Sequence, residues 1–117
     1  MKLIINHSYT SLNEYIKKER SNKYAASQIK KKESQISEWE TMYKHHRLTY
    51  PLKLTFTWHL KNAKRDPDNI AFAKKFVLDG FVKSGFFVND GQKQINELAD
   101  KFVVDGEEYV EIEILEN

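Results

Sequence analysis

The sequence predicts an α+β protein in which a small mixed or antiparallel sheet packs against helices, with a long helical segment in its N-terminal part. Two observations lead to this fold class. Residues 52–61 alternate between apolar and polar side chains, which is the period of a strand covered on one face. Residues 23–46 lack glycine and proline and repeat apolar residues at helical spacing, which predicts a long helix. Strands and helices are mixed along the chain, as in an α+β domain.

With 117 residues, the chain is expected to form a single domain, 1–117, that buries a core without disulfides. It has no cysteine, which excludes both a disulfide framework and a thiolate metal site. No apolar run reaches membrane-spanning length, and the apolar patch at the N-terminus is too short for a signal peptide. We therefore expect a cytoplasmic protein.

The N-terminal part should begin with a short β-branched strand over residues 2–6. Ser11 stands three residues before Glu14, which is the spacing of a capping box, so a first helix is expected over residues 12–20. Residues 21–22 are either a break or a new helix cap.

The second helix, over residues 23–46, has only a narrow apolar stripe. Its own domain therefore covers it only in part, which leaves a face for a second subunit or an extended ligand. The tandem His45-His46 at its end is more typical of an interaction with the helix dipole than of a metal site. The stripe consists of Ile29, Ile36, Trp39 and Tyr43.

A third helix is expected over residues 69–83, after the alternating strand. Asp66 or Asp68 can cap it, Pro67 suits an early helix position, and the pair at 84–85, Ser-Gly, can end it.

The C-terminal part predicts strands and a hairpin. Residues 86–88 are apolar and predict a short buried strand, and residues 89–91 have turn chemistry. Residues 93–99 fit either a helix or an irregular strand. Residues 101–104 and 109–115 flank an Asp-Gly pair, which predicts a hairpin.

Charge is distributed unevenly, although the formal net charge is only +2. Residues 17–32 are strongly basic with Glu19 as their one acid, whereas residues 105–116 are acidic and contain no base. Such an asymmetry indicates a polyanion partner for the basic segment; the alternative is a solvated helix face. The basic residues are Lys17, Lys18, Arg20, Lys23, Lys30, Lys31 and Lys32.

Three carboxylates follow predicted strand ends: Asp66, Asp68 and Asp90. If the two strands that precede them are neighbours, the three acids meet at one sheet edge. Clustered carboxylates with a lysine beside them are typical of an Mg²⁺ site that handles phosphate. Each acid also has a plainer interpretation, because Asp66 and Asp68 can be helix caps and Asp90 a turn residue.

On a helical wheel that starts at Asp68, Lys75 and Asp79 fall on the same side, whereas Lys74 lies well off that line. Lys75 and Asp79 can also pair as i,i+4 neighbours. A lysine here would stabilise the charge of a phosphodiester transition state. Phe72 shares this side; burial against a neighbour is the favoured interpretation, ahead of stacking on an unpaired base. No Gly-rich phosphate loop is present, which argues against a P-loop nucleotide triphosphatase.

The motif Arg65-Asp66-Pro67-Asp68-Asn69, the helix with Lys75 and Asp79, and the segment GFFVNDGQ at 85–92 resemble the RusA family of Holliday junction resolvases. This family includes versions from phages and prophages of Gram-positive bacteria. The resemblance is close over the C-terminal half and loose over the N-terminal half. It implies an Mg²⁺-dependent endonuclease, with Mn²⁺ able to substitute. Such an enzyme would act as a homodimer on four-way DNA junctions, in DNA recombination and repair, in a bacterial or phage-infected host cell.

The same resemblance implies roles for single residues. Asp66, Asp68 and Asp90 match the metal-binding acids of the family, Lys75 matches its active-site lysine, and Asp79 is a further possible metal ligand. The segment from Asn69 to Lys75 is longer than in better-known members by about one helical turn, which leaves the choice between Lys74 and Lys75 open. Asn89 stands where many members carry a second acid.

Contacts to DNA are expected from basic residues, which would bind phosphates without regard to sequence. Two alternatives to junction resolution stay open. One is a noncatalytic DNA-binding phage protein that uses the basic N-terminal helices, and the other is the same metal chemistry on RNA or DNA flaps. The expected DNA-binding residues are Lys64, Arg65, Lys17, Lys18, Lys30, Lys31 and Lys32.

Overall fold

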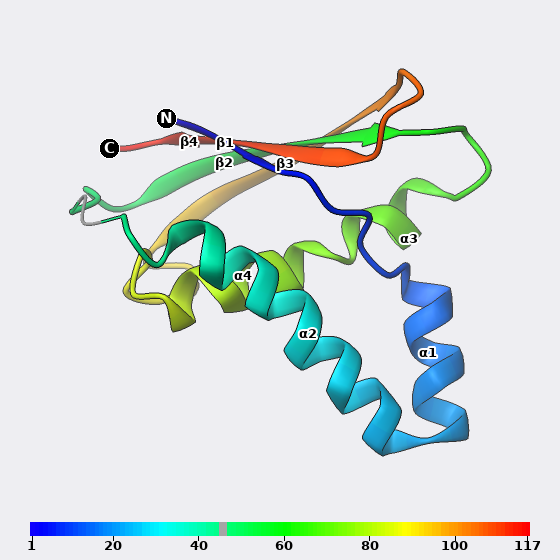
Figure 1. Cartoon of the computed structure of the whole chain (residues 1–117). Coiled ribbons are helices and arrows are strands. Elements are labelled where there is room, and N and C mark those ends of the chain that lie inside the picture. Colours follow the sequence, from blue (N-terminus) through cyan, green and yellow to red (C-terminus); the bar gives the residue numbers. More distant parts are fainter. Residues whose placement is uncertain (45–46) are drawn as a thin grey trace.

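A four-stranded mixed sheet forms one layer of the protein, and helices cover one of its faces, as the computed structural model shows (Figure 1). The structure describes residues 1–44 and 47–117. The proposed role of His45-His46 lies outside these residues. The helix predicted over 23–46 is too long, because the observed helix ends at Thr41 and residues 42–44 are not helical. The strands are β1 (Lys2–Ile5), β2 (Leu52–Leu60), β3 (Ile95–Val104) and β4 (Tyr109–Leu115), and the helices are α1 (Leu12–Ser21), α2 (Lys23–Thr41), α3 (Pro67–Ala71) and α4 (Lys74–Lys83).

The sheet has the strand order β1-β4-β2-β3. Strand β4 runs antiparallel to both β1 and β2, whereas β3 runs parallel to β2. The predicted α+β class with a mixed sheet is therefore confirmed. None of the helices in residues 1–44 and 47–117 is long and apolar enough to cross a membrane.

Strand β2 is the centre of the core, as its alternation predicts. Every second side chain is buried beneath the helix layer, because successive residues of a strand point to opposite faces of the sheet. The buried residues of β2 are Leu52, Leu54, Phe56, Trp58 and Leu60.

The predicted hairpin at the C-terminus is wrong, because β2 lies between β3 and β4. The connection between these strands crosses the end of β2, where the carbonyl of Leu60 accepts hydrogen bonds from the N–H groups of Asp105 (3.1 Å) and Gly106 (3.2 Å). The Asp-Gly pair does reverse the chain, and Gly106 has a φ of 85° that favours glycine. A turn signal thus fixes the reversal of direction but not the pairing of the two strands.

Residues 86–88 do not form the predicted strand. Phe86 and Phe87 are buried because their rings pack on Phe81 of α4, with ring centroids 5.4 Å and 5.1 Å away. Their apolar character reflects burial under the end of a helix instead of strand pairing. Residues 93–99, which fitted either a helix or a strand, contain the start of β3.

The predicted apolar stripe of α2 is its packing face only in part: Ile36 packs against the core, but the aromatic residues of the stripe do not. Trp39 and Tyr43 are 57% and 80% exposed, whereas Ser34, Ser37 and Thr41 are buried. Small side chains are needed because α2 crosses very close to α4: a Cβ on Gly80 would lie 1.8 Å from Ser37 Oγ. Ser37 Oγ donates a hydrogen bond to the carbonyl of Val77 at 2.9 Å.

The single helix predicted over 69–83 is divided into α3 and α4. Between them the N–H groups of Ala73 and Lys75 bond to carbonyls three residues earlier, at Ile70 and Phe72. This tighter winding departs from the 100° step, but the side predicted to be apolar, with Ile70, Val77 and Phe81, is still the buried one.

Candidate functional site

Asp66 and Asp68 are exposed where the chain leaves β2 and enters α3. Asp66 occupies the N-cap position, but its side chain makes no capping hydrogen bond. Asp68 accepts a hydrogen bond from the N–H of Asn69 at 3.0 Å through Oδ1. The plain interpretation of Asp66 as a side-chain cap is therefore wrong, and both carboxylates present oxygens to solvent.

Asp90 is also exposed, but it lies at the other end of the sheet. Leu52, the first residue of β2, pairs with Ile95, and Leu60, the last, pairs with Val104. The turn that holds Asp90 therefore adjoins the start of β2, whereas Asp66 follows its end. Nine residues of β2 separate these ends by about 30 Å.

The expectation that the three acids meet at one sheet edge does not hold within one chain. It depended on a strand at 86–88 beside β2, and this strand is absent. Within residues 1–44 and 47–117, no group of three or more His, Cys, Asp or Glu side chains could hold a metal ion.

The two candidate lysines have different surroundings. Lys74 is partly buried and pairs with Asp100 of β3, which also accepts a hydrogen bond from Trp58 Nε1 at 2.9 Å. Lys75 is exposed, and its Nζ lies 3.8 Å from Asp79 Oδ2. The predicted i,i+4 pair is confirmed, and Lys75 is the lysine that an external phosphate can reach.

Lys64 and Arg65 flank the acids at the end of β2. Lys64 is exposed, and a guanidinium nitrogen of Arg65 lies 3.8 Å from a carboxylate oxygen of Glu108. Because this pair is partly exposed, it is weak. Arg65 can therefore exchange Glu108 for a phosphate.

The basic helix α1 starts beside the acids. The N–H of Asn13 donates a hydrogen bond to Asn69 Oδ1 at 2.9 Å, and the ring of Tyr15 packs on Phe72 with centroids 5.5 Å apart. The favoured interpretation of Phe72, partial burial against a neighbour, is confirmed. From this anchor, α1 and the first half of α2 extend away from the sheet (Figure 1).

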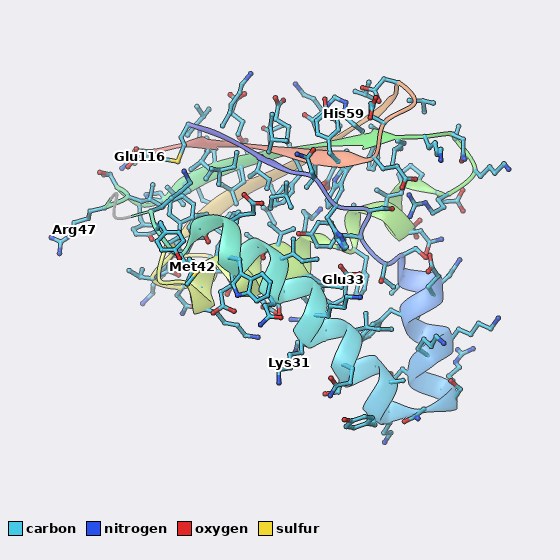
Figure 2. All side chains as sticks on the ribbon, in the orientation of Figure 1. Lys31, Glu33, Met42, Arg47, His59 and Glu116 are labelled. Atoms are coloured by element: carbon cyan, nitrogen blue, oxygen red, sulfur yellow. The ribbon has the colours of Figure 1, made fainter. Side chains whose placement is uncertain are left out.

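The basic residues of these two helices face solvent, and Figure 2 shows Lys31 pointing away from the protein. In the described part of the chain, none of the predicted DNA-binding lysines on α1 and α2 takes part in an ion pair. Those lysines are Lys17, Lys18, Lys30, Lys31 and Lys32.

A histidine cluster that the sequence interpretation missed lies at the same end of β2. His59 stacks on Tyr109 with ring centroids 4.0 Å apart, and its Nδ1 lies 2.6 Å from Asp105 Oδ2. This hydrogen bond holds the pKa of the Asp105 carboxyl below its ordinary value. His59 and Tyr109 are cross-strand partners, so only the register, which the sequence does not reveal, would have identified the pair.

A second missed cluster joins the N-terminal segment to α2. The carboxylate of Glu33 is buried and accepts hydrogen bonds from His7 and from the N–H and hydroxyl of Thr10. Burial acts to raise the pKa of Glu33, but these hydrogen bonds outweigh it and hold the pKa below its ordinary value. Burial, with the charges of Glu33 and Glu40, raises the pKa of the nearby Tyr9.

No protein-family model matches this chain, and no curated protein sequence is significantly similar to it.

Proposed function

We propose that the protein is an Mg²⁺-dependent endodeoxyribonuclease that resolves four-way DNA junctions by paired, symmetric phosphodiester hydrolysis. The observation that carries this proposal is the exposed pair Asp66 and Asp68, flanked by Lys64 and Arg65, at the point where basic helix α1 is anchored. Asp66 makes no side-chain capping bond, and Asp68 uses one oxygen to accept from Asn69, so exposed carboxylate oxygens are available to a cation, and the adjacent bases favour a polyanionic substrate.

The donor set fits Mg²⁺ in part. This ion is commonly held by one or two carboxylates together with water and substrate phosphate, and Asp66 and Asp68 offer two. When bound, the ion would neutralise phosphate charge and activate water near neutral pH. Lys75 would add positive charge beside the phosphate, and Lys64 and Arg65 would position the DNA backbone.

A second copy of the chain would supply the third acid. Symmetric cutting of a two-fold junction calls for a two-fold enzyme. Because Asp90 and Asp66 lie at opposite ends of β2 in one chain, two copies in antiparallel orientation would place Asp90 of one near Asp66 and Asp68 of the other. The proposed active unit is therefore a homodimer with two shared sites.

The test is the substitution Asp66→Asn, which keeps the size of the side chain and removes its charge. We expect cleavage of a four-way junction in Mg²⁺ to fall at least a hundredfold, while junction binding persists. Glu111→Gln, which removes a charge from β4, is the matched control and should cleave normally. Unchanged cleavage by Asp66→Asn would refute the catalytic assignment.

A noncatalytic DNA-binding protein is the second candidate, because the acids do not converge in one chain whereas the basic helices are exposed. In that case, Lys31→Glu with Lys32→Glu would abolish binding, and the wild-type protein would cut no junction in Mg²⁺ or Mn²⁺. Cleavage compared among four-way junctions, flaps, duplex DNA and RNA at matched salt separates junction resolution from related metal-dependent activities.

A further inference from the structure

Strand β3 leaves an unpaired edge of the sheet on which several apolar side chains are exposed. It has ten residues, pairs with β2 on one side, and meets no strand on its other side within residues 1–44 and 47–117. Leu98 and Val104 are 47% and 55% exposed. They stand beside the buried Leu54 and Leu60 of β2 in the register of the sheet. Leu98 and Val104 therefore lie on the same face of the sheet as the core, but the helices do not cover them fully.

The opposite edge of the sheet, formed by β1, is much shorter than the β3 edge. Strand β1 has only four residues, and Lys2 pairs with Glu113 at 3.8 Å along it. A very short edge strand is a common protection against association, whereas a long strand with an unpaired edge is a template for pairing with another chain. The apolar residues of β3 are interspersed with the charged Glu97, Asp100 and Lys101, so charge limits the registers that this edge accepts. The two edges therefore indicate which one is built to receive a partner.

We propose that the free edge of β3 is the surface on which a second copy of the chain docks, with the two β3 strands antiparallel and a two-fold axis at Ala99. The need for a two-fold enzyme comes from the proposed function, on which this inference rests.

Charge selects the register of this pairing. With Ala99 on the axis, the exposed Glu97 of each copy lies opposite Lys101 of the other, which gives two favourable cross-strand pairs. With Asp100 on the axis, the two Asp100 carboxylates would oppose each other, and with Lys101 on the axis, the two ammonium groups would. Like charges directly opposite destabilise a sheet, so the Ala99 register is favoured.

This arrangement also brings the proposed catalytic acids to the same end. In the Ala99 register, Ile95 of one copy lies opposite Val103 of the other, and Val103 pairs with His59 near the end of β2. The Asp90 turn of one copy then adjoins the strand end that leads to Asp66 of the other. Across the dimer, the Asp90 turn and this strand end are separated laterally by two strand spacings, about 10 Å. Within one chain, they are separated by the length of β2.

Cysteine cross-linking tests the interface directly, because the chain has no cysteine of its own. Residues directly opposite in an antiparallel pair have Cα atoms about 4.5–5.5 Å apart, which is within the range of a disulfide. We expect Ala99→Cys to form a disulfide-linked dimer on mild oxidation. Ile4→Cys, which is exposed on the β1 edge, is the control and should cross-link at least tenfold more slowly.

Charge reversal tests the register. Glu97→Lys should weaken the dimer roughly tenfold in sedimentation, since it replaces two attractive pairs by two repulsive ones. Adding Lys101→Glu should restore dimerisation to near the wild-type level. Circular dichroism of each variant controls for folding. Equal weakening by the single and double variants would overturn the Ala99 register.

The outcomes separate this inference from the proposed function. If the protein is dimeric and cuts junctions but Ala99→Cys cross-links no faster than Ile4→Cys, the β3 interface is wrong and the nuclease proposal stands. If Ala99→Cys cross-links but Asp66→Asn still cuts, the interface stands and the catalytic assignment is wrong. A protein that is monomeric at the concentrations at which it cuts junctions would overturn the interface.

Discussion

The two faces of α2 differ in residue type, and hydrophobic periodicity does not predict which face is buried. The face that packs on α4 buries hydroxyl-bearing Ser34, Ser37 and Thr41, whereas the opposite face exposes the aromatic ring of Trp39. On the packed face, close approach of the backbones decides which residues fit. On the open face no such limit applies, and the large ring of Trp39 lies mostly in solvent.

The difference shows that close packing can select residues more strongly than apolar area does. A buried hydroxyl is tolerated where it is hydrogen-bonded, and Thr41 Oγ1 donates to the carbonyl of Ser37 at 2.9 Å. Each serine or threonine on the packed face thus satisfies its own polar group while occupying little volume. Substitutions on the two faces should therefore have very different effects on stability.

The largest effect is expected at the crossing point of α2 and α4. In Gly80→Ala, the new Cβ would lie 1.8 Å from Ser37 Oγ and 2.3 Å from the backbone oxygen of Ser34. Because a backbone atom cannot rotate away, the helices must separate, and we expect a loss of about 3 kcal/mol in the free energy of unfolding. Urea denaturation followed by circular dichroism measures it.

Gly91→Ala is the matched control, because its nearest neighbour is the flexible side-chain oxygen of Gln94, 3.3 Å from the added Cβ. We expect it to change stability by less than about 1 kcal/mol. Equal destabilisation by the two substitutions would contradict the close crossing of α2 and α4.

An intermediate effect is expected at Glu33, on the packed face nearer the start of α2. Its folded-state pKa is lowered by hydrogen bonds from His7 and Thr10, in spite of burial, which acts to raise it. The ionised carboxylate therefore stabilises the fold at pH values above its unfolded pKa, and this contribution is lost as the pH falls through the lower folded pKa. Glu33→Gln should cost about 2 kcal/mol at pH 7.

The pH dependence distinguishes this role from simple packing. The difference in unfolding free energy between wild type and Glu33→Gln should shrink as the pH is lowered from 7 to 3. Glu38→Gln, a neighbour on the same helix, should show a small difference that varies little with pH. A constant difference at Glu33 across this range would show that shape, and not charge, is what the site requires.

The sequence was sufficient to predict elements that depend only on residues close together in the chain. The alternation of β2 and the apolar positions Ile70, Val77 and Phe81 all correspond to buried residues. Ser11 caps α1 as expected, since its Oγ accepts from the N–H of Glu14 at 3.3 Å. These features depend on a few consecutive residues, whose periodicity and capping chemistry are visible in the sequence.

Features that depend on which strands are neighbours were not predictable. The apolar pair Phe86 and Phe87 is compatible with a strand or with packing under a helix end, and the alternation of β4 does not reveal whether it pairs with β3 or β2. The convergence of Asp66 and Asp90 required a strand beside β2 that does not form, so the error in topology became an error in the site. The choice of Asp66, Asp68 and Asp90 as candidate acids did not depend on this topology.

The smallest effect is expected on the open face of α2. Trp39 is 57% exposed, so Trp39→Ala removes little buried area and should change the free energy of unfolding by no more than about 0.5 kcal/mol. Because thermal unfolding of a 117-residue domain shifts by several degrees for each kcal/mol, calorimetry resolves a change of this size. A loss above about 1.5 kcal/mol that grows with protein concentration would mean that a second copy covers this face. The β3 edge would then have a competitor for the dimer interface, and Ala99→Cys cross-linking in the Trp39→Ala background would decide between the two surfaces.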